Sequence, residues 1–285
     1  RPYDVLSDNI LMLVNMIDFA RRQKKLSRFF FASTSEVYAG TLKYFELSIP
    51  TPESTPLAIT DLSQQRTSYM LSKIYGEALC RQSGIPFTIF RPHNVYGARM
   101  GMSHVIPEQL KKTFEAKDND MIDVFSVDHT RCFCFIDDAI EMVWRMMNSN
   151  DCKHKTLNLG TQNPEISMKE LAKICHKVTE KILVINEMPA STGSPTRRCP
   201  DMSLTKRLIN FQSQVDLHAG ISLTYDWYRK NIFEGNNEIS KKIKEAKKPS
   251  IIIGESLLNS NSSKYLFNKI KEFLIENNKI TEDWN

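Results

Sequence analysis

Tyr69 and Lys73 are the two residues of this chain whose types and spacing most directly suggest chemistry. Residues four apart lie on the same face of a helix, so the Tyr69 hydroxyl and the Lys73 ammonium can point into one site. A free phenol titrates at about pH 10 and is a poor base in neutral solution, but an adjacent ammonium favours the phenolate. The pair is therefore suited to removing the proton of an alcohol at about pH 7.

The spacing alone does not identify a site, because Tyr265 and Lys269 repeat it. Taken by itself, the first pair also fits an ordinary half-exposed helix face. The segments on either side of it favour a functional interpretation. They are Phe31-Ala-Ser-Thr34-Ser-Glu36-Val-Tyr38 before the pair and Arg91-Pro-His-Asn94-Val-Tyr-Gly97 after it.

Together the three segments resemble the extended short-chain dehydrogenase/reductase family. In that family a strand ends in Ser/Thr-rich residues before Val-Tyr, a Tyr-x-x-x-Lys helix follows, and a later strand leads into Arg-x-x-Asn-x-x-Gly. The chain has all three in this order, and the resemblance covers about residues 1–235. It implies an NAD-dependent epimerase, dehydratase or decarboxylase that converts a nucleotide-diphosphate sugar through a transient 4-keto intermediate.

The resemblance assigns a role to each residue of the central group. Tyr69 is expected to exchange a proton with a sugar hydroxyl, while Lys73 tunes it and binds the nicotinamide ribose. Thr34 is expected to hydrogen-bond the same hydroxyl, since a hydroxyl group can both donate and accept. The other interpretation of Thr34 is a capping threonine at the end of a strand.

Glu36 is the residue that separates subgroups of the family. Thr34-Ser35-Glu36 resembles the Thr-Ser-Glu of UDP-glucuronate decarboxylases and GDP-mannose dehydratases, in which an acid assists the step after oxidation. Ser35 stands where the dTDP-glucose dehydratases have Asp, which argues against that subgroup. A solvated loop charge remains the alternative for Glu36.

Three further residues match substrate-binding positions of the family. Asn94 corresponds to an asparagine that contacts the sugar or diphosphate, and Arg131 and Arg198 to arginines that contact the diphosphate or substrate. A guanidinium suits this task because its planar fork binds phosphate or carboxylate through two hydrogen bonds. Cys132 replaces the aspartate that follows the first arginine in the family, and surface arginines are the alternative interpretation.

The pattern along the chain predicts the fold class α/β, with a partial Rossmann-like parallel sheet and a small α/β substrate-binding portion. Apolar spacing predicts a helix over 9–22, and short apolar runs predict buried strands at 28–32, 86–91, 132–136 and 156–160. The catalytic helix is expected over 68–82, and 40–66 is expected to be a loop because it contains three prolines.

One element of such a fold is missing from the sequence. The ten glycines include no G-x-G-x-x-G turn, which normally holds the cofactor pyrophosphate at a helix N-terminus. The sequence therefore predicts an N-terminally truncated fragment that lacks the first strands and binds NAD poorly. The alternatives are a degenerate member of the family and an inactive remnant.

Residues 236–285 differ in composition from the rest and predict a separate unit. A charged linker is followed by an apolar run at 249–254, which favours a strand, and by an amphipathic helix over 262–276. This βα unit resembles a segment of the large molybdopterin-fold subunit of bacterial respiratory complex I. The predicted domains are thus 1–235 and an unrelated 236–285.

Composition and charge bear on the partners, the location and the metal content to be expected. The net charge of +5 is mild and the lysines are dispersed, which disfavours a nucleic-acid partner. No apolar run reaches the roughly 20 residues needed to span a bilayer, and no signal peptide opens the chain, so a cytoplasmic location is expected.

The six cysteines show no zinc-type spacing, and no metal is expected. Family analogy adds a possible homodimer.

Overall fold

The computed structural model describes residues 1–59, 61–190, 195–234, 241–242, 245–246 and 263–280, and it divides into two compact units, Arg1–Asp226 and Trp227–Asn285. The strand expected at 249–254 lies outside the described residues. The helix expected after it is α11 (Ser263–Glu276) in the second unit. The described residues that form the candidate site belong to the first unit.

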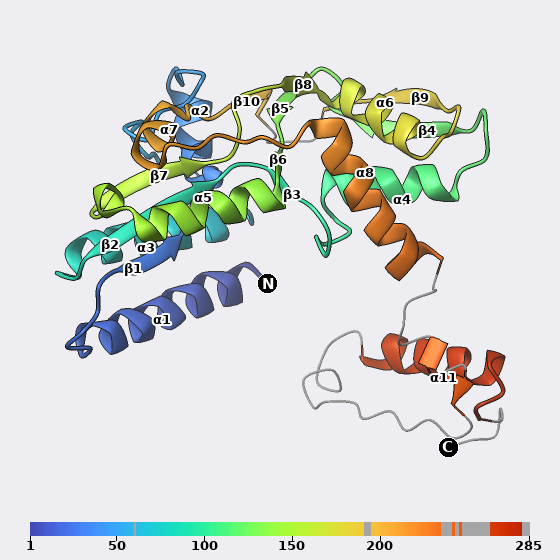
Figure 1. The fold of residues 1–285 in the computed structure, drawn as a ribbon, viewed down its shortest axis with the longest axis horizontal. Helices are drawn as coiled ribbons and strands as arrows, with labels where there is room; N and C mark the ends of the chain where they lie inside the picture. The colour runs from blue at the N-terminus through green and yellow to red at the C-terminus, as the bar shows by residue number, and fades with distance from the viewer. Residues whose placement is uncertain (60, 191–194, 235–240, 243–244, 247–262, 281–285) are drawn as a thin grey trace. The chain divides into compact units, whose positions relative to one another are not determined.

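A three-stranded parallel sheet is surrounded by helices in the left part of Figure 1. Its strands β1 (Phe29–Ala32), β2 (Phe87–Pro92) and β7 (Lys155–Leu159) lie in the order β1-β2-β7, and both pairings are parallel. Among the described residues, β1 is therefore an edge strand. The parallel α/β class predicted from the sequence is confirmed.

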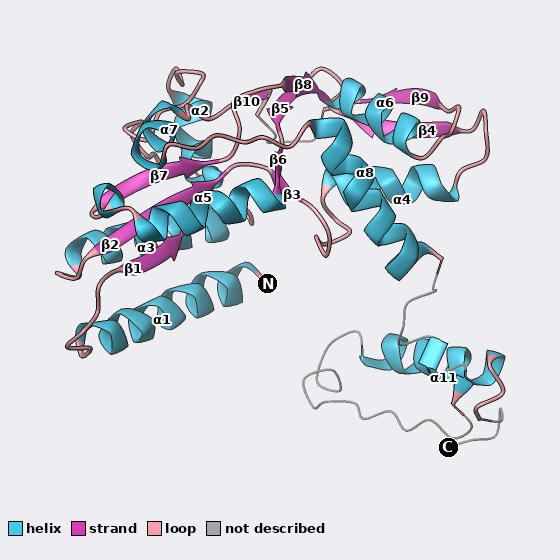
Figure 2. Ribbon diagram, in the orientation of Figure 1, coloured by secondary structure: helices cyan, strands magenta, loops and turns pink. Residues whose placement is uncertain are grey.

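Helices cover both faces of this sheet (Figure 2). On one face, Leu13 and Ile17 pack with Cys80, Phe87 and Ile89. These residues come from α1 (Pro2–Arg21), α3 (Thr67–Gln82) and β2. On the other face, α5 (Ile136–Asn148) and α7 (Ser203–Ile209) pack on β7. The side chains of the consecutive phenylalanines of β1 pack alternately on the two faces of the sheet, because successive side chains of a strand point to opposite faces.

The rest of the described part of the first unit is built from short elements around a second three-stranded sheet and two strand pairs. These are η1 (Ser35–Tyr38), α2 (Ala39–Tyr44), β3 (Val95–Tyr96), α4 (Val105–Glu115), β4 (Met121–Phe125), β5 (Thr130–Cys132), β6 (Cys134–Phe135), η2 (Asn150–Cys152), β8 (Glu165–Ser167), α6 (Met168–Val178), β9 (Val184–Met188), β10 (Arg197–Arg198) and α8 (Leu217–Tyr228). A π-helical turn, η3 (Arg229–Phe233), follows in the second unit. The strands pair as β10-β5-β8, β3-β6 and β4-β9.

Two expectations about local structure were wrong. The loop expected over 40–66 contains the helix α2. The single strand expected at 132–136 is divided at Phe133: β5 pairs with β8 and β10, whereas β6 pairs with β3. Residues 131–135 are all buried, so the continuous apolar run does not reveal that the chain changes sheets.

Candidate active site

The chain turns sharply where β1 ends, and this turn presents three polar residues. Thr34 is the N-cap of η1, and its hydroxyl oxygen accepts a hydrogen bond from the Glu36 backbone N–H at 3.2 Å. A capping hydroxyl of this kind satisfies a donor that the helix itself leaves open. Thr34, Ser35 and Glu36 are thereby held at the carboxyl end of β1, which is where parallel α/β sheets place their ligands.

Helix α3 brings Tyr69 and Lys73 to the same end of the sheet. The helix lies so close to β1 that a Cβ on Gly76 would fall 2.4 Å from the Phe31 ring, so only glycine fits there. The Lys73 ammonium donates to the Ala32 carbonyl oxygen at 2.9 Å and lies 5.6 Å from the Tyr69 ring centroid. Burial lowers the pKa of Lys73 below its ordinary value.

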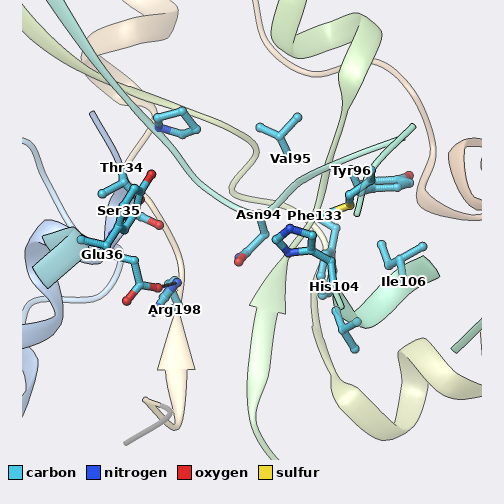
Figure 3. A pocket seen from close by; sticks show the side chains of 14 residues that line it. Thr34, Ser35, Glu36, Asn94, Val95, Tyr96, His104, Ile106, Phe133 and Arg198 are labelled. Atoms are coloured by element: carbon cyan, nitrogen blue, oxygen red, sulfur yellow. Dashed lines mark hydrogen bonds and ion pairs between the residues drawn. The ribbon is translucent and has the colours of Figure 1, made fainter. Parts of the chain in front are cut away.

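A cavity of about 450 Å³ opens where β1 and β2 end and α3 begins, and five of the seven predicted site residues line it. They are Thr34, Glu36, Tyr69, Asn94 and Arg198. Figure 3 shows Thr34, Glu36 and Arg198 on one side of the cavity and Asn94 with His104 on the other. Lys73 does not line the cavity. Its ammonium lies 5.6 Å from the ring centroid of Tyr69, which does line it.

Asn94 is held in place by its backbone and its side chain. Its φ of 41° lies in the left-handed region, which asparagine tolerates better than most residues. Its amide donates to the Cys132 carbonyl oxygen at 3.0 Å. These two constraints fix the side chain at the wall between the main cavity and a neighbouring one.

Glu36 lies between two arginines. One carboxylate oxygen is 2.7 Å from Nη2 of Arg66, and the other is 2.8 Å from Nη1 of Arg198. Burial alone raises the pKa of this carboxyl, but the two guanidinium groups outweigh it and hold the pKa below its ordinary value. Glu36 is therefore an ionised carboxylate beside Thr34, and not a solvated loop charge.

Arg131 lies outside the main cavity. It lines a neighbouring cavity of about 300 Å³ that shares Asn94, Val105 and Phe133 with the main one. Its guanidinium donates to the backbone carbonyl oxygens of residues 130, 195 and 196. Burial, and then the nearby charge of Arg198, lower the pKa of Arg131 to about 10.

A buried polar network supports the catalytic elements from within. Glu77, two turns after Tyr69 on α3, binds Arg91 of β2 through two hydrogen bonds of 2.8 and 2.7 Å and accepts a third from Ser33. Arg91 also donates to the hydroxyl of Tyr38, the last residue of η1. The network thus ties η1, α3 and β2 together.

The network continues through Asn158 of β7, whose side-chain oxygen accepts from Tyr38 at 2.9 Å and lies 3.0 Å from Nε2 of His93. His93 is 1% exposed, and burial lowers its pKa to about 3. It therefore remains neutral and fixes the strand end that carries Asn94.

Sequence reasoning missed Arg66 and His104. Arg66 could have been noticed because a positive charge at the start of a helix is unfavourable unless an acid lies nearby. His104 carries no comparable signal, since it reaches the cavity from a loop before α4. Over the described parts of the chain, no three His, Cys, Asp or Glu side chains are grouped as a metal site would require. Nor do those parts contain a helix long and apolar enough to cross a membrane.

Comparison with known proteins gives decarboxylases and epimerases of nucleotide sugars among the relatives of this chain. A UDP-N-acetyl-alpha-D-glucosaminuronate decarboxylase of Bacillus cytotoxicus is 29% identical over 75% of this chain and 67% of its own length. UDP-glucuronic acid decarboxylase 2 of Arabidopsis thaliana is 27% identical over 83% of this chain, which spans only 52% of that relative.

A solved structure supports the fold. The UDP-glucuronic acid 4-epimerase of Bacillus cereus, solved with UDP-glucuronic acid and NAD, superposes with a TM-score of 0.67 at 24% identity. The superposition covers 78% of this chain and 68% of the epimerase. At this identity the likeness concerns the fold alone.

Two family models match different parts of the chain. The model described as molybdopterin oxidoreductase matches residues 206–285, which agrees in kind with the resemblance noted for the tail; the specific likeness to a complex I subunit stays a prediction. The model of the NAD dependent epimerase/dehydratase family matches residues 1–160, more than half of the chain. The chain therefore belongs to the NAD dependent epimerase/dehydratase family.

Proposed function

We propose that the protein is an NAD-dependent enzyme that converts a nucleotide-diphosphate sugar through a 4-keto intermediate. One observation carries the proposal: Thr34 and Tyr69 line a single cavity, and the Lys73 ammonium lies against the Tyr69 ring. These groups can take a proton from an alcohol, orient that alcohol and stabilise the resulting charge.

The residues present fit the nicotinamide end of NAD. The Lys73 ammonium has three donors and gives one to Ala32, so others can serve ribose hydroxyls. The pyrophosphate end has no G-x-G-x-x-G turn in this sequence to hold it. When bound, NAD accepts the hydride from C4 of the sugar.

Proton movement is assigned to the chain's own residues. Tyr69 is assigned as the base that takes the proton of the C4 hydroxyl as the C4–H bond breaks, leaving a ketone at C4. The Thr34 oxygen already accepts from the Glu36 backbone N–H, so its own O–H is directed to the substrate oxygen. Re-reduction from the other face of the ketone would give the C4 epimer, with Tyr69 returning the proton to the C4 oxygen.

Substrate binding is assigned to residues on the walls of the two cavities. Asn94 lies at the wall between them, Arg198 lines the first and Arg131 the second. Arg198 and Arg131 are register partners on the adjacent strands β10 and β5. Two neighbouring guanidinium groups suit a diphosphate or carboxylate ligand.

A second candidate is decarboxylation of a UDP-glucuronate-like sugar. The pairing of Glu36 with Arg198 inside the cavity favours it, as does the decarboxylase activity named for the relatives. In this reaction a C4 ketone accepts the electrons of the C5–carboxylate bond, carbon dioxide leaves, and C5 is then protonated. Arg198 would hold the carboxylate beside that ketone.

UDP-glucuronate with added NAD separates the candidates. The C4 epimer identified by mass spectrometry and NMR supports epimerisation, whereas a UDP-pentose together with carbon dioxide supports decarboxylation. A 4-keto sugar that loses water supports dehydration. If NAD shows no binding by calorimetry and no sugar is converted, the protein is the inactive remnant and the proposal fails.

We also propose a homodimer formed through α1 and α3. The exposed face of α1 carries Met12, Met16 and Phe19, which are 62%, 49% and 60% exposed. Apolar groups gathered on one helix face favour burial against a partner. Sedimentation equilibrium should give twice the 32.9 kDa of one chain, and Met16→Glu should give the monomer.

A further inference from the structure

Both oxygens of the Glu36 carboxylate are occupied, each by a different arginine. Oε2 pairs with Arg66 and Oε1 with Arg198, at 2.7 and 2.8 Å. Arg66 immediately precedes α3, whereas Arg198 belongs to β10. The carboxylate therefore joins the start of the catalytic helix to a strand of a different sheet.

The two arginines differ in their access to the cavity. Arg198 is 17% exposed and lines the cavity together with Glu36. Arg66 is 41% exposed and is not a lining residue, so it reaches the carboxylate from outside. An anionic ligand that enters the cavity meets Arg198 and competes with Glu36 for it.

We infer that Arg66 is a positioning residue that keeps Glu36 ionised and aimed into the cavity while Arg198 exchanges from Glu36 to the ligand. After the exchange, Oε1 of Glu36 is released toward the substrate, and Oε2 remains paired with Arg66. The inference rests on the proposed function only for the identity of the ligand. The two ion pairs of Glu36 are present in the protein without any ligand.

The charge balance around Glu36 supports this role. Loss of Arg198 to a ligand would leave a largely buried carboxylate, and burial favours the neutral acid. Arg66 offsets that tendency. Its own position at a helix N-terminus is unfavourable for a cation, and Glu36 compensates for it. Among the described residues, the titratable or charged groups that line the cavity or act on Glu36 are Arg66 before α3, Tyr69 on α3, Tyr96 on β3, His104 before α4, Arg131 on β5 and Arg198 on β10.

The first test measures Glu36 directly in the full chain without ligand. Carbon-13 NMR of labelled glutamate, assigned with Glu36→Gln, follows the carboxyl during an acid titration. Arg66→Met should raise the pKa of Glu36, and Arg66→Lys should restore most of the difference. The matched control is Arg145→Met, because Arg145 is 40% exposed and pairs with Glu141 at 2.6 Å. A Glu36 titration in Arg66→Met that equals the control overturns the inference.

The second test separates positioning from ligand binding, with UDP-glucuronate as the probe. Arg66→Met should lower kcat about tenfold and leave KM within about twofold, whereas Arg198→Met should raise KM. A raised KM with unchanged kcat in Arg66→Met would make Arg66 a ligand contact and overturn the inference. If no variant or wild-type protein turns over the probe, the proposed function fails, and the NMR titration still decides the role of Arg66.

Discussion

Two helices of this molecule carry the same Tyr-x-x-x-Lys spacing, and their surroundings differ. On α3, the Lys73 ammonium donates to a carbonyl oxygen at the end of β1 and lies against the Tyr69 ring. On α11, the Lys269 ammonium pairs with Glu272, three residues further along the same helix, and both side chains are more than half exposed. The first lysine thus contacts the sheet, and the second forms an exposed ion pair within its own helix.

The difference shows that the site arises from what surrounds the helix. Gly76 lets α3 approach β1, and Glu77 ties the helix to Arg91 inside the first unit. A fixed approach of this kind places a phenol and an ammonium beside Thr34 with little freedom to move. On α11 the same residue types occur at the same spacing, and the ion pair described there joins two exposed side chains of one helix.

The buried ion pair beneath α3 should give the largest effect. Glu77 and Arg91 are 4% and 3% exposed, so removing one charge leaves the other buried without its partner. Glu77→Gln should lower the free energy of unfolding by about 3 to 5 kcal/mol, measured by urea denaturation. Glu272→Gln on α11 removes an exposed pair and should cost less than about 1 kcal/mol. Equal losses would show that α3 is no better supported than α11.

Tyr69→Phe is the corresponding test of chemistry. It removes the hydroxyl that exchanges the proton, so kcat should fall at least about 100-fold, measured as 4-keto sugar formation from UDP-glucuronate. Circular dichroism should show an unchanged fold. Tyr265→Phe should retain full activity. Retained activity in Tyr69→Phe would exclude Tyr69 from the mechanism.

The sequence predicted the parts of the site that depend on local order. Thr34 and Glu36 follow directly on a strand, and Tyr69 lies on a helix whose period is visible in the sequence, so their convergence at one sheet end could be expected. The parallel sheet followed from the same alternation of strands and helices. These features depend on residues close together in the chain.

What the sequence could not predict depends on contacts between distant segments. Arg66 reaches Glu36 across thirty residues, and Arg131 faces a neighbouring cavity because β5 ends in a different sheet from β6. No spacing rule encodes either arrangement, since each follows from how separate strands stack. The change of sheet at Phe133 was missed for the same reason.

His93 tests whether the network below α3 contributes stability that depends on pH. Its pKa is about 3 in the folded protein and about 6.5 when unfolded. Between these values the unfolded chain binds the extra proton, so stability is fully present above about pH 6.5 and falls as the pH decreases. Relative to His93→Gln, the wild type should lose about 2 kcal/mol between pH 7 and pH 5, measured by urea denaturation.

The control for this measurement is His154→Asn, which changes an exposed histidine with a φ of 60° to a residue that tolerates that backbone. It should keep the pH dependence of the wild type. If His93→Gln also keeps it, the His93 ring does not carry the dependence, and the network contributes to α3 only through its ion pair.

The two lysines give the smallest and most specific comparison. Lys73→Met removes the ammonium that lies 5.6 Å from the Tyr69 ring centroid, and kcat should fall about tenfold because a charge beside the proton-transferring group is lost. Lys269→Met should leave kcat unchanged.

Because burial lowers the pKa of Lys73, its charge is lost at a lower pH than in an ordinary lysine. Wild-type kcat should therefore decline on the alkaline side as Lys73 loses its proton, and Lys73→Met should lack this limb. If the alkaline decline in kcat persists in Lys73→Met, another group causes it. Lys73 would then have no more part in catalysis than Lys269.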